Sequence, residues 1–185
     1  YDVLDAAQLS AREPFVSGVH GAIHWLDPVT VMDPGGLTKA YADLFVRRGG
    51  QFVKGDARSL RESDGHWTVT AEGGLLTARD AVLALGPWSS DVFRALGYRY
   101  PLAIKRGYHR HYRAESNAVL NHPVLDRAAG YVLAPMAQGI RLTSGAEFAA
   151  RDALPTPVQI ARDEPLARSL FPLGDPVEAQ PWVGN

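Results

Sequence analysis

The sequence predicts two structural parts, an α/β layer with a β-meander and a mainly antiparallel sheet, so the expected fold class is α/β with α+β. Three observations support this. Residues 80–85 (DAVLAL) contain a continuous apolar run directly after Asp80, typical of a strand buried on both faces. Turn signals just before this run divide the chain into short β-rich segments. Beyond Tyr98 apolar and polar residues alternate, as in strands with one solvated face. We therefore assign residues 30–97 to the first part and residues 1–29 with 98–185 to the second.

A helix is predicted directly after Asp33. Asp33 can cap its N-terminus, Pro34 suits its first turn, and the paired Gly49 and Gly50 end it. Apolar side chains recur at helical spacing on one face, at Leu37, Tyr41, Leu44 and Phe45. Residues 51–55 (QFVKG) then predict a short strand.

The next segment predicts a three-stranded antiparallel meander. Turn signals separate its strands, at Asp64-Gly65 and Gly73-Gly74. The apolar run at 80–85 then leads through Gly86 into a short helix, SSDVFRALG. A glycine at the end of a buried strand lets the backbone approach a ligand, while the simpler interpretation is a tight turn.

The second part contains long strands and one further helix. The segments PLAIKRGYHRHYRA and GYVLAPMAQGIRLTSGAEFA alternate in polarity and predict antiparallel strands. The segment TPVQIARDEPLARSLFP predicts a helix. We expect the residues before 30 to join these strands in one sheet.

Composition excludes several classes of function. The chain has 185 residues, a net charge of -1 and no cysteine, which removes disulfides and cysteine metal sites. Basic residues do not cluster, so nucleic acid is not an expected partner. No apolar run approaches the roughly twenty residues of a membrane span, and we expect a cytoplasmic protein. The first residue is Tyr1 instead of methionine, which indicates a fragment or a processed form.

Four histidines suggest a rival class of site. His109 and His111 would share one strand face, and His20 and His24 one helix face, so zinc or iron in a hydrolase is an alternative. No further ligand lies at a recognised metal spacing, and the regular alternation of YHRHYR is that of an ordinary polar strand. We therefore expect no metal.

Several segments together resemble the FAD-dependent D-amino-acid oxidase superfamily, in particular its D-amino-acid dehydrogenases and glycine oxidase-like members. The likeness extends from about Val3 to the end of the chain. The segments that carry it occur in the family's order and spacing, and are VMDPGGLTKAYADLFVRRGGQFVKGDARSL, ARDAVLALGPWSS, YPLAIKRGYHRHYR, YVLAPMAQGIRLTSGAEF and PWVGN.

The chain also departs from the family pattern. The family binds the FAD pyrophosphate through a glycine-rich strand-turn-helix, and this sequence contains no G-x-G-x-x-G. The family's carboxylate-binding arginine lies beyond the position of the final WVGN. The resemblance therefore implies the central piece of a flavoenzyme, with part of the FAD-binding domain in residues 30–97 and most of the substrate-binding domain in the remainder.

The resemblance implies a set of cofactor-binding residues. Val53 matches the position whose backbone meets the adenine of FAD. Ala84, Leu85 and Gly86 match the strand end beside the cofactor, and Trp88 matches the bulky residue that follows. For Val53 and Trp88 a core position is an equal alternative.

The implied substrate is a small amino acid or amine. Its carboxylate requires an arginine or a phenol, and its amine must lose a proton before hydride transfer to FAD. The candidates are Arg106, Tyr108, His109, Tyr131 and Arg141. Tyr131 ranks first, because it opens the strand from which the family presents a substrate-binding tyrosine. Arg141 has the opposite strand parity from its apolar neighbours, which suits either a cavity or solvent.

The resemblance implies an oxidoreductase that oxidises a D-amino acid, glycine or a related amine. The alternatives are a catalytically incomplete folded fragment and the histidine metal hydrolase. The residues that would reveal the individual substrate lie largely outside the chain. The electron acceptor, oxygen or a membrane-associated quinone, and the oligomeric state both stay open.

Overall fold

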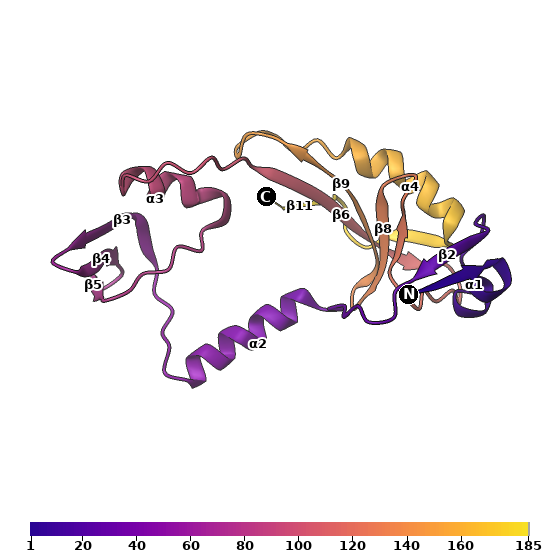
Figure 1. The fold of residues 1–185 in the computed structure, drawn as a ribbon, viewed down its shortest axis with the longest axis horizontal. Helices are drawn as coiled ribbons and strands as arrows, with labels where there is room; N and C mark the ends of the chain where they lie inside the picture. Colours follow the sequence, from indigo (N-terminus) through magenta and orange to yellow (C-terminus); the bar gives the residue numbers. More distant parts are fainter. Residues whose placement is uncertain (185) are drawn as a thin grey trace. The chain divides into compact units, whose positions relative to one another are not determined.

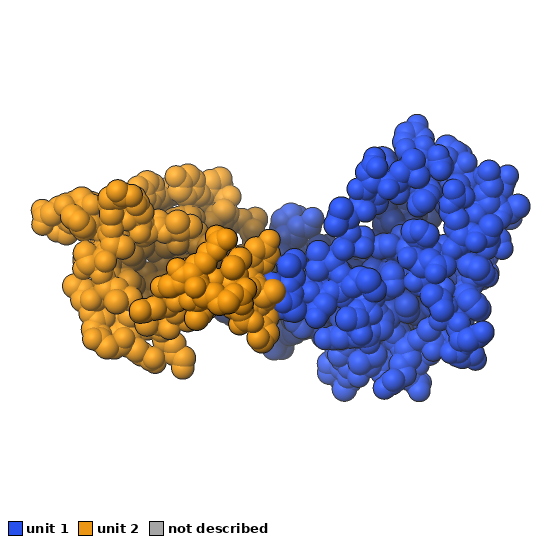
Figure 2. Space-filling view, turned by 90° about the horizontal axis from the view of Figure 1, so that it is seen from below, with its two compact units in different colours: residues 1–37, 105–184 blue, residues 38–104, 185 orange. Residues whose placement is uncertain are grey.

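The computed structural model describes residues 1–184 and divides them into two compact units. Residues 1–37 and 105–184 form the first unit, and residues 38–104 the second (Figure 2). The first unit is therefore discontinuous in sequence. Among the described residues, no helix has the length and apolar character needed to cross a membrane.

The first unit is mainly β-structure (Figure 1). Its elements are β1 (Asp2–Asp5), α1 (Ala6–Arg12), β2 (Gly21–His24), β6 (Lys105–Ala114), β7 (Val124–Asp126), β8 (Tyr131–Met136), β9 (Gly139–Phe148), α4 (Val158–Leu170), β10 (Leu173–Pro176) and β11 (Trp182–Gly184). The main sheet is antiparallel, with strand order β10-β6-β9-β8-β7 and with β11 also paired to β6. The predicted long antiparallel strands and the helix after them are confirmed.

Helix α4 covers one face of the main sheet (Figure 1). Tyr112, Leu133 and Leu142 project from that face into one buried cluster with Ile160 and Ala167 of α4. Removing this apolar surface from water supplies the main stabilisation of the unit. The opposite face of the sheet carries the polar side chains of His109, His111 and Arg141.

Strands β1 and β2 form a separate two-stranded sheet, so the expectation that they join the main sheet is wrong. Asp5 ends β1 by capping α1, which confines the strand to four residues paired with β2 alone. The following residues attach the hairpin to the unit. The Asn121 amide donates to the Glu13 carboxylate at 3.0 Å, and the Ser17 amide donates to the Leu170 carbonyl at 2.9 Å.

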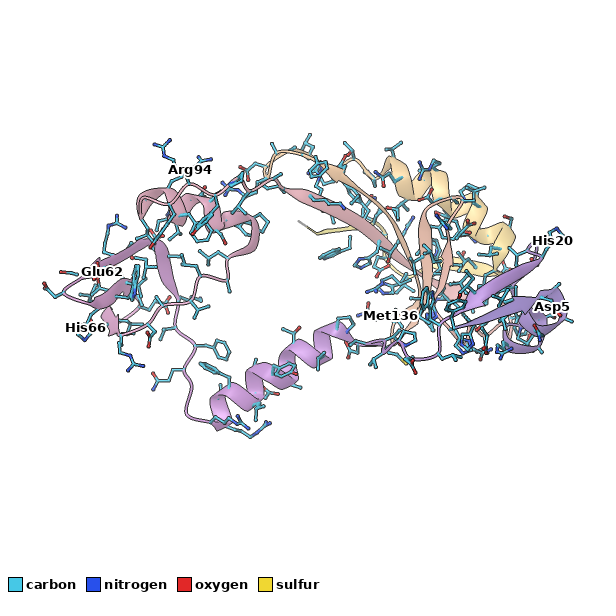
Figure 3. All side chains as sticks on the ribbon, in the orientation of Figure 1. Asp5, His20, Glu62, His66, Arg94 and Met136 are labelled. Atoms are coloured by element: carbon cyan, nitrogen blue, oxygen red, sulfur yellow. The ribbon has the colours of Figure 1, made fainter. Side chains whose placement is uncertain are left out.

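The link from the first unit to the second passes through α2 (Pro34–Arg47). Asp33 caps this helix as predicted, because its carboxylate accepts the Gly36 amide at 2.8 Å. Met136, labelled in Figure 3, ends β8, and the next amide, of Ala137, donates to the Met32 carbonyl at 3.0 Å just before the helix. None of the residues of α2 is buried, so its apolar stripe is exposed.

The second unit contains the predicted meander. Its strands are β3 (Gly55–Ser63), β4 (His66–Ala71) and β5 (Gly74–Ala78), paired antiparallel in that order. Figure 3 labels Glu62 and His66 on either side of the first turn. Asp64 and Gly65 adopt φ of 53° and 72°, the left-handed conformation that a tight hairpin turn requires. A short 3₁₀ turn (Gly86–Trp88) and α3 (Ser89–Ala95) complete the unit.

Two predicted strands of the second unit are absent. Residues 51–54 and 80–85 have no regular secondary structure, and Val82 is 90% exposed. A strand needs a neighbouring strand to satisfy its backbone groups. Within the described chain neither segment has such a neighbour, so the apolar run at 80–85 stays solvent-exposed.

Candidate functional site

The strand register places a group of polar side chains on the face of the main sheet turned away from α4. His111 lies opposite Arg141, and His109 lies opposite both Thr143 on one neighbouring strand and Trp182 on the other. Directly opposed residues project from the same side of an antiparallel sheet. We call this surface, formed by His109, His111, Arg141, Thr143 and Trp182, the histidine face.

The ring of His109 is held between two other rings. It stacks on Trp182 with centroids 4.6 Å apart and meets His111 edge-on at 5.2 Å. Burial, the neighbouring His111 and Arg141 lower the pKa of His109, against the opposing effect of Glu178. The surroundings of His109 therefore favour its neutral imidazole form.

His111 is paired with Glu178. The Glu178 carboxylate accepts the His111 amide at 2.8 Å and lies 2.5 Å from His111 Nδ1. Desolvation opposes ionisation of Glu178, but the His111 amide and ring outweigh it and lower the pKa of the carboxyl. Both carboxylate oxygens are thus engaged by one residue.

Arg141 has no such partner. Its Nε atom is buried, and within residues 1–184 it makes no hydrogen bond. Buried polar groups are normally paired, and leaving one unpaired costs about 1–3 kcal/mol. A guanidinium group offers a planar fork of donors that matches a carboxylate. The histidine face therefore contains a guanidinium group, that of Arg141, with an unpaired donor that can bind an anion.

Arg106 and Tyr108 lie on the other side of the sheet. Arg106 donates to the Glu147 carboxylate and to the carbonyls of Ala153 and Leu154, each at 2.7 Å. The Tyr108 hydroxyl donates to Glu147 at 2.6 Å. The hydrogen bond from Tyr108, with others from Thr156 and Arg106, lowers the pKa of Glu147 to about 2. These contacts fix the segment before α4.

Tyr131 also lies on the α4 side. It is 0% exposed and belongs to the cluster that contains Leu133 and Leu142. Its hydroxyl makes no well-formed hydrogen bond within the described chain. Burial, with the nearby charges of Asp126 and Asp163, raises its pKa. Of the five sequence candidates for the substrate site, the structure brings together only His109 and Arg141, and it places Arg106, Tyr108 and Tyr131 on the opposite side of the sheet.

The cofactor candidates lie in the second unit and are open to solvent. Val53 and Trp88 are each 53% exposed, and Ala84 and Gly86 are also exposed. Leu85 is half-buried, and Gly86 has φ of 55° with open space where a side chain would project. Accessible backbone at these positions fits one flank of an FAD site. The pyrophosphate cradle has no counterpart in the sequence, so the fit covers only part of the cofactor.

The metal alternative receives no support from the arrangement of ligands. His24 ends strand β2 and His20 precedes it, so the helix predicted to align them is wrong. Among residues 1–184 no three histidine or acidic side chains form a group that could hold a metal ion.

Sequence reasoning missed Glu178 and Trp182. Trp182 stood within the PWVGN segment, and its pairing with β6 required knowledge of the sheet register. Glu178 is a single acidic residue that lies 67 positions from His111, and no local pattern connects the two.

Comparisons with known proteins agree with one another. The family model described as DAO, FAD dependent oxidoreductase, matches residues 1–185. A D-amino acid dehydrogenase of Methylobacterium nodulans is 29% identical over 192 residues, which cover 100% of this chain and 46% of that protein. This chain thus spans about half the length of that curated relative.

Solved structures show the same fold. Glycine oxidase from Bacillus cereus superposes with a TM-score of 0.75 at 21% identity, over 99% of this chain and 51% of that one. Glycine oxidase from Geobacillus kaustophilus gives 0.74 at 17%, over 99% and 50%. NikD, an amino acid oxidase of nikkomycin biosynthesis, gives 0.69 at 19%, over 99% and 52%. The mixed α/β fold class expected from the sequence is confirmed.

Proposed function

Because the chain belongs to the DAO family of FAD-dependent oxidoreductases, we propose that it forms the central part of a flavoenzyme that oxidises a D-amino acid, glycine or a related amine. In this reaction the Cα–H bond breaks and hydrogen leaves with its electron pair. Bound FAD would supply the acceptor for that hydride. The chain's own residues would bind the substrate, orient it and accept protons from it.

The unpaired Arg141 carries the proposal for substrate binding. An α-carboxylate placed on its guanidinium would satisfy the buried Nε and gain a charge-assisted hydrogen bond. Glu178 does not compete for Arg141, because both of its oxygens are engaged by His111. This assignment uses the histidine face and leaves Tyr131, the first candidate from sequence, with a packing role.

The proposed cofactor contacts are in the second unit. Val53 would meet the adenine, and Ala84, Leu85, Gly86 and Trp88 would line the flank of FAD. Apart from the half-buried Leu85, these residues are exposed in the described chain, which supports the proposal, since a buried segment could not receive a ligand. The remaining contacts, above all those to the pyrophosphate, would come from sequence outside this chain.

The test uses the intact oxidoreductase that contains this chain. Flavin reduction is followed without oxygen, with D- and L-amino acids, glycine and amines that lack a carboxylate. We expect reduction by a D-amino acid or glycine and not by its decarboxylated analogue. Failure of every amino acid to reduce the bound flavin would overturn the proposal.

Arg141→Gln should raise KM by about 10- to 100-fold with a smaller change in kcat, because a carboxylate hydrogen bond to a charged group contributes about 1.5–3 kcal/mol in ground and transition states alike. Arg127→Gln is the matched control, since Arg127 is exposed in the turn between β7 and β8. Equal KM values for the Arg141 variant and wild type would remove Arg141 from the site.

A further inference from the structure

His109 and Arg141 are placed to act on one small molecule. Arg141 lies two residues from Thr143, the residue opposite His109, so the two side chains are diagonal neighbours on one face. Diagonal neighbours on adjacent antiparallel strands are about 7–8 Å apart, within reach of a long side chain. In an α-amino acid the carboxylate and the amine are attached to the same carbon. A substrate carboxylate on Arg141 can therefore present its amine to the His109 ring.

The His109 ring is held in place by neighbouring rings, while its nitrogens remain available for hydrogen bonding. Trp182 covers one of its faces and His111 meets it edge-on. Neither ring nitrogen makes a hydrogen bond to any other described residue. His111, by contrast, is committed to Glu178 through its backbone and its ring. Of the two histidines on this face, His109 is the one with a nitrogen available to a ligand.

The charges around His109 favour its neutral form. The ionisable groups that influence it are His111, Arg141 and Glu178, and burial adds to the effect of the first two. Their net effect lowers the pKa of His109. A neutral imidazole has a lone pair that can accept a proton.

On the premise of the proposed function, we propose that His109 is a catalytic residue that accepts a proton from the substrate ammonium group. The N–H bond of the ammonium breaks, the proton binds an imidazole nitrogen, and the electron pair stays on the substrate nitrogen. That lone pair then forms the C=N bond as hydride leaves Cα, for which bound FAD would be the acceptor. The imidazolium returns its proton to solvent, so atoms and charge balance.

The decisive experiment compares wild type and His109→Gln in the intact flavoenzyme across pH, with the rate of flavin reduction as the readout. At neutral pH we expect the variant to be slower by at least about 100-fold, the lower range for general acid–base catalysis. The deficit should shrink by about tenfold per pH unit towards the ammonium pKa, because the substrate then arrives as the free amine. A packing role would not give this pH dependence.

Three controls accompany the variant. Arg127→Gln changes an exposed residue in the turn between β7 and β8, outside the histidine face, and should keep the wild-type rate and pH profile. Binding of propionate, which has the carboxylate but no amine, should stay within about twofold in His109→Gln. His109→Ala with added imidazole should recover part of the lost rate.

The outcomes separate this inference from the proposed function. If wild type does not reduce its flavin with any amino acid, the proposed function itself fails. If wild type does and His109→Gln keeps its rate, or is slow to the same degree at every pH, the inference is overturned. Loss of flavin from both His109 variants would assign the residue to structural support and would also overturn it.

Discussion

Glu147 connects three side chains on the α4 side of the main sheet. Its carboxylate accepts hydrogen bonds from Arg106, Tyr108 and Thr156, at 2.7, 2.6 and 2.7 Å. Since these donors hold the segment that leads into α4, the charge on Glu147 contributes to the stability of the first unit.

This arrangement predicts a loss of stability in acid. The pKa of Glu147 falls from 4.5 to about 2, so its contribution is complete above pH 4.5 and is lost as pH falls towards 2. Glu147→Gln should lower Tm at neutral pH, and the Tm difference from wild type should close across that interval. Thermal melts of both proteins at a series of pH values measure this Tm difference. Glu72→Gln, at an exposed residue, is the control, and a constant Tm difference would contradict the prediction.

At the residue scale, the sequence predicted which residues of a strand share a face. It did not predict what packs against each face. Arg141 was expected to point away from Ile140 and Leu142, and the register bears this out. The same alternation could not tell which face α4 would cover. That face decides whether Tyr108 and Tyr131 are buried, and it depends on long-range packing that no local pattern reveals.

Among the elements, α4 carries an interior proline. Pro165 lies within Val158–Leu170 and cannot donate the helical hydrogen bond to the carbonyl four residues before it. The residue is exposed, so the proline ring fills no core position. The helix persists because Ile160, Ala167 and Leu170 bury their side chains against the sheet.

Pro165→Ala should therefore stabilise the protein, by about 1–3 kcal/mol, because alanine restores the donor and has the higher helix propensity. Chemical denaturation followed by circular dichroism measures the change. Pro155→Ala is a control that should destabilise the protein, by about 0.4–1 kcal/mol. Pro155 lies in the exposed segment before the helix, and replacing it gives the unfolded chain more conformational freedom. Destabilisation by Pro165→Ala would show that the native helix is adapted to the proline.

Elements with local signals were predicted from sequence, and elements that depend on distant partners were not. The cap of α2 at Asp33 and the turn at Asp64-Gly65 are determined by neighbouring residues. The apolar run at 80–85 has a strand composition, but the described chain provides no neighbouring strand for it. Composition indicates what a segment can form, and hydrogen-bond partners decide whether it does.

At the scale of the whole molecule, the proposed function implies that the chain would hold only part of a dinucleotide site. We expect the 185-residue chain to bind FAD at well below one equivalent, whereas the intact protein binds it fully. The amides and helix dipole of a glycine-rich turn contribute most of the pyrophosphate contacts, and the sequence contains no such turn.

Flavin absorbance after dialysis of both proteins against equal FAD concentrations measures the difference. Riboflavin, which has no pyrophosphate, should show a much smaller difference between the two proteins. Stoichiometric FAD in the 185-residue chain would contradict the prediction.

The discontinuity of the first unit also affects the order in which the protein can fold during synthesis. Glu13 bonds Asn121 across 108 positions, and the second unit lies entirely between them. The hairpin of β1 and β2 therefore leaves the ribosome long before the sheet to which it attaches, while the strands β3 to β5 are close neighbours in sequence and can pair at once. Contacts between distant segments form slowly, because a large loop must close before they contribute. The surface that carries the histidine face is consequently completed only after the second unit and strands β6 to β10 have been synthesised, since β11, which follows them in sequence, supplies Trp182.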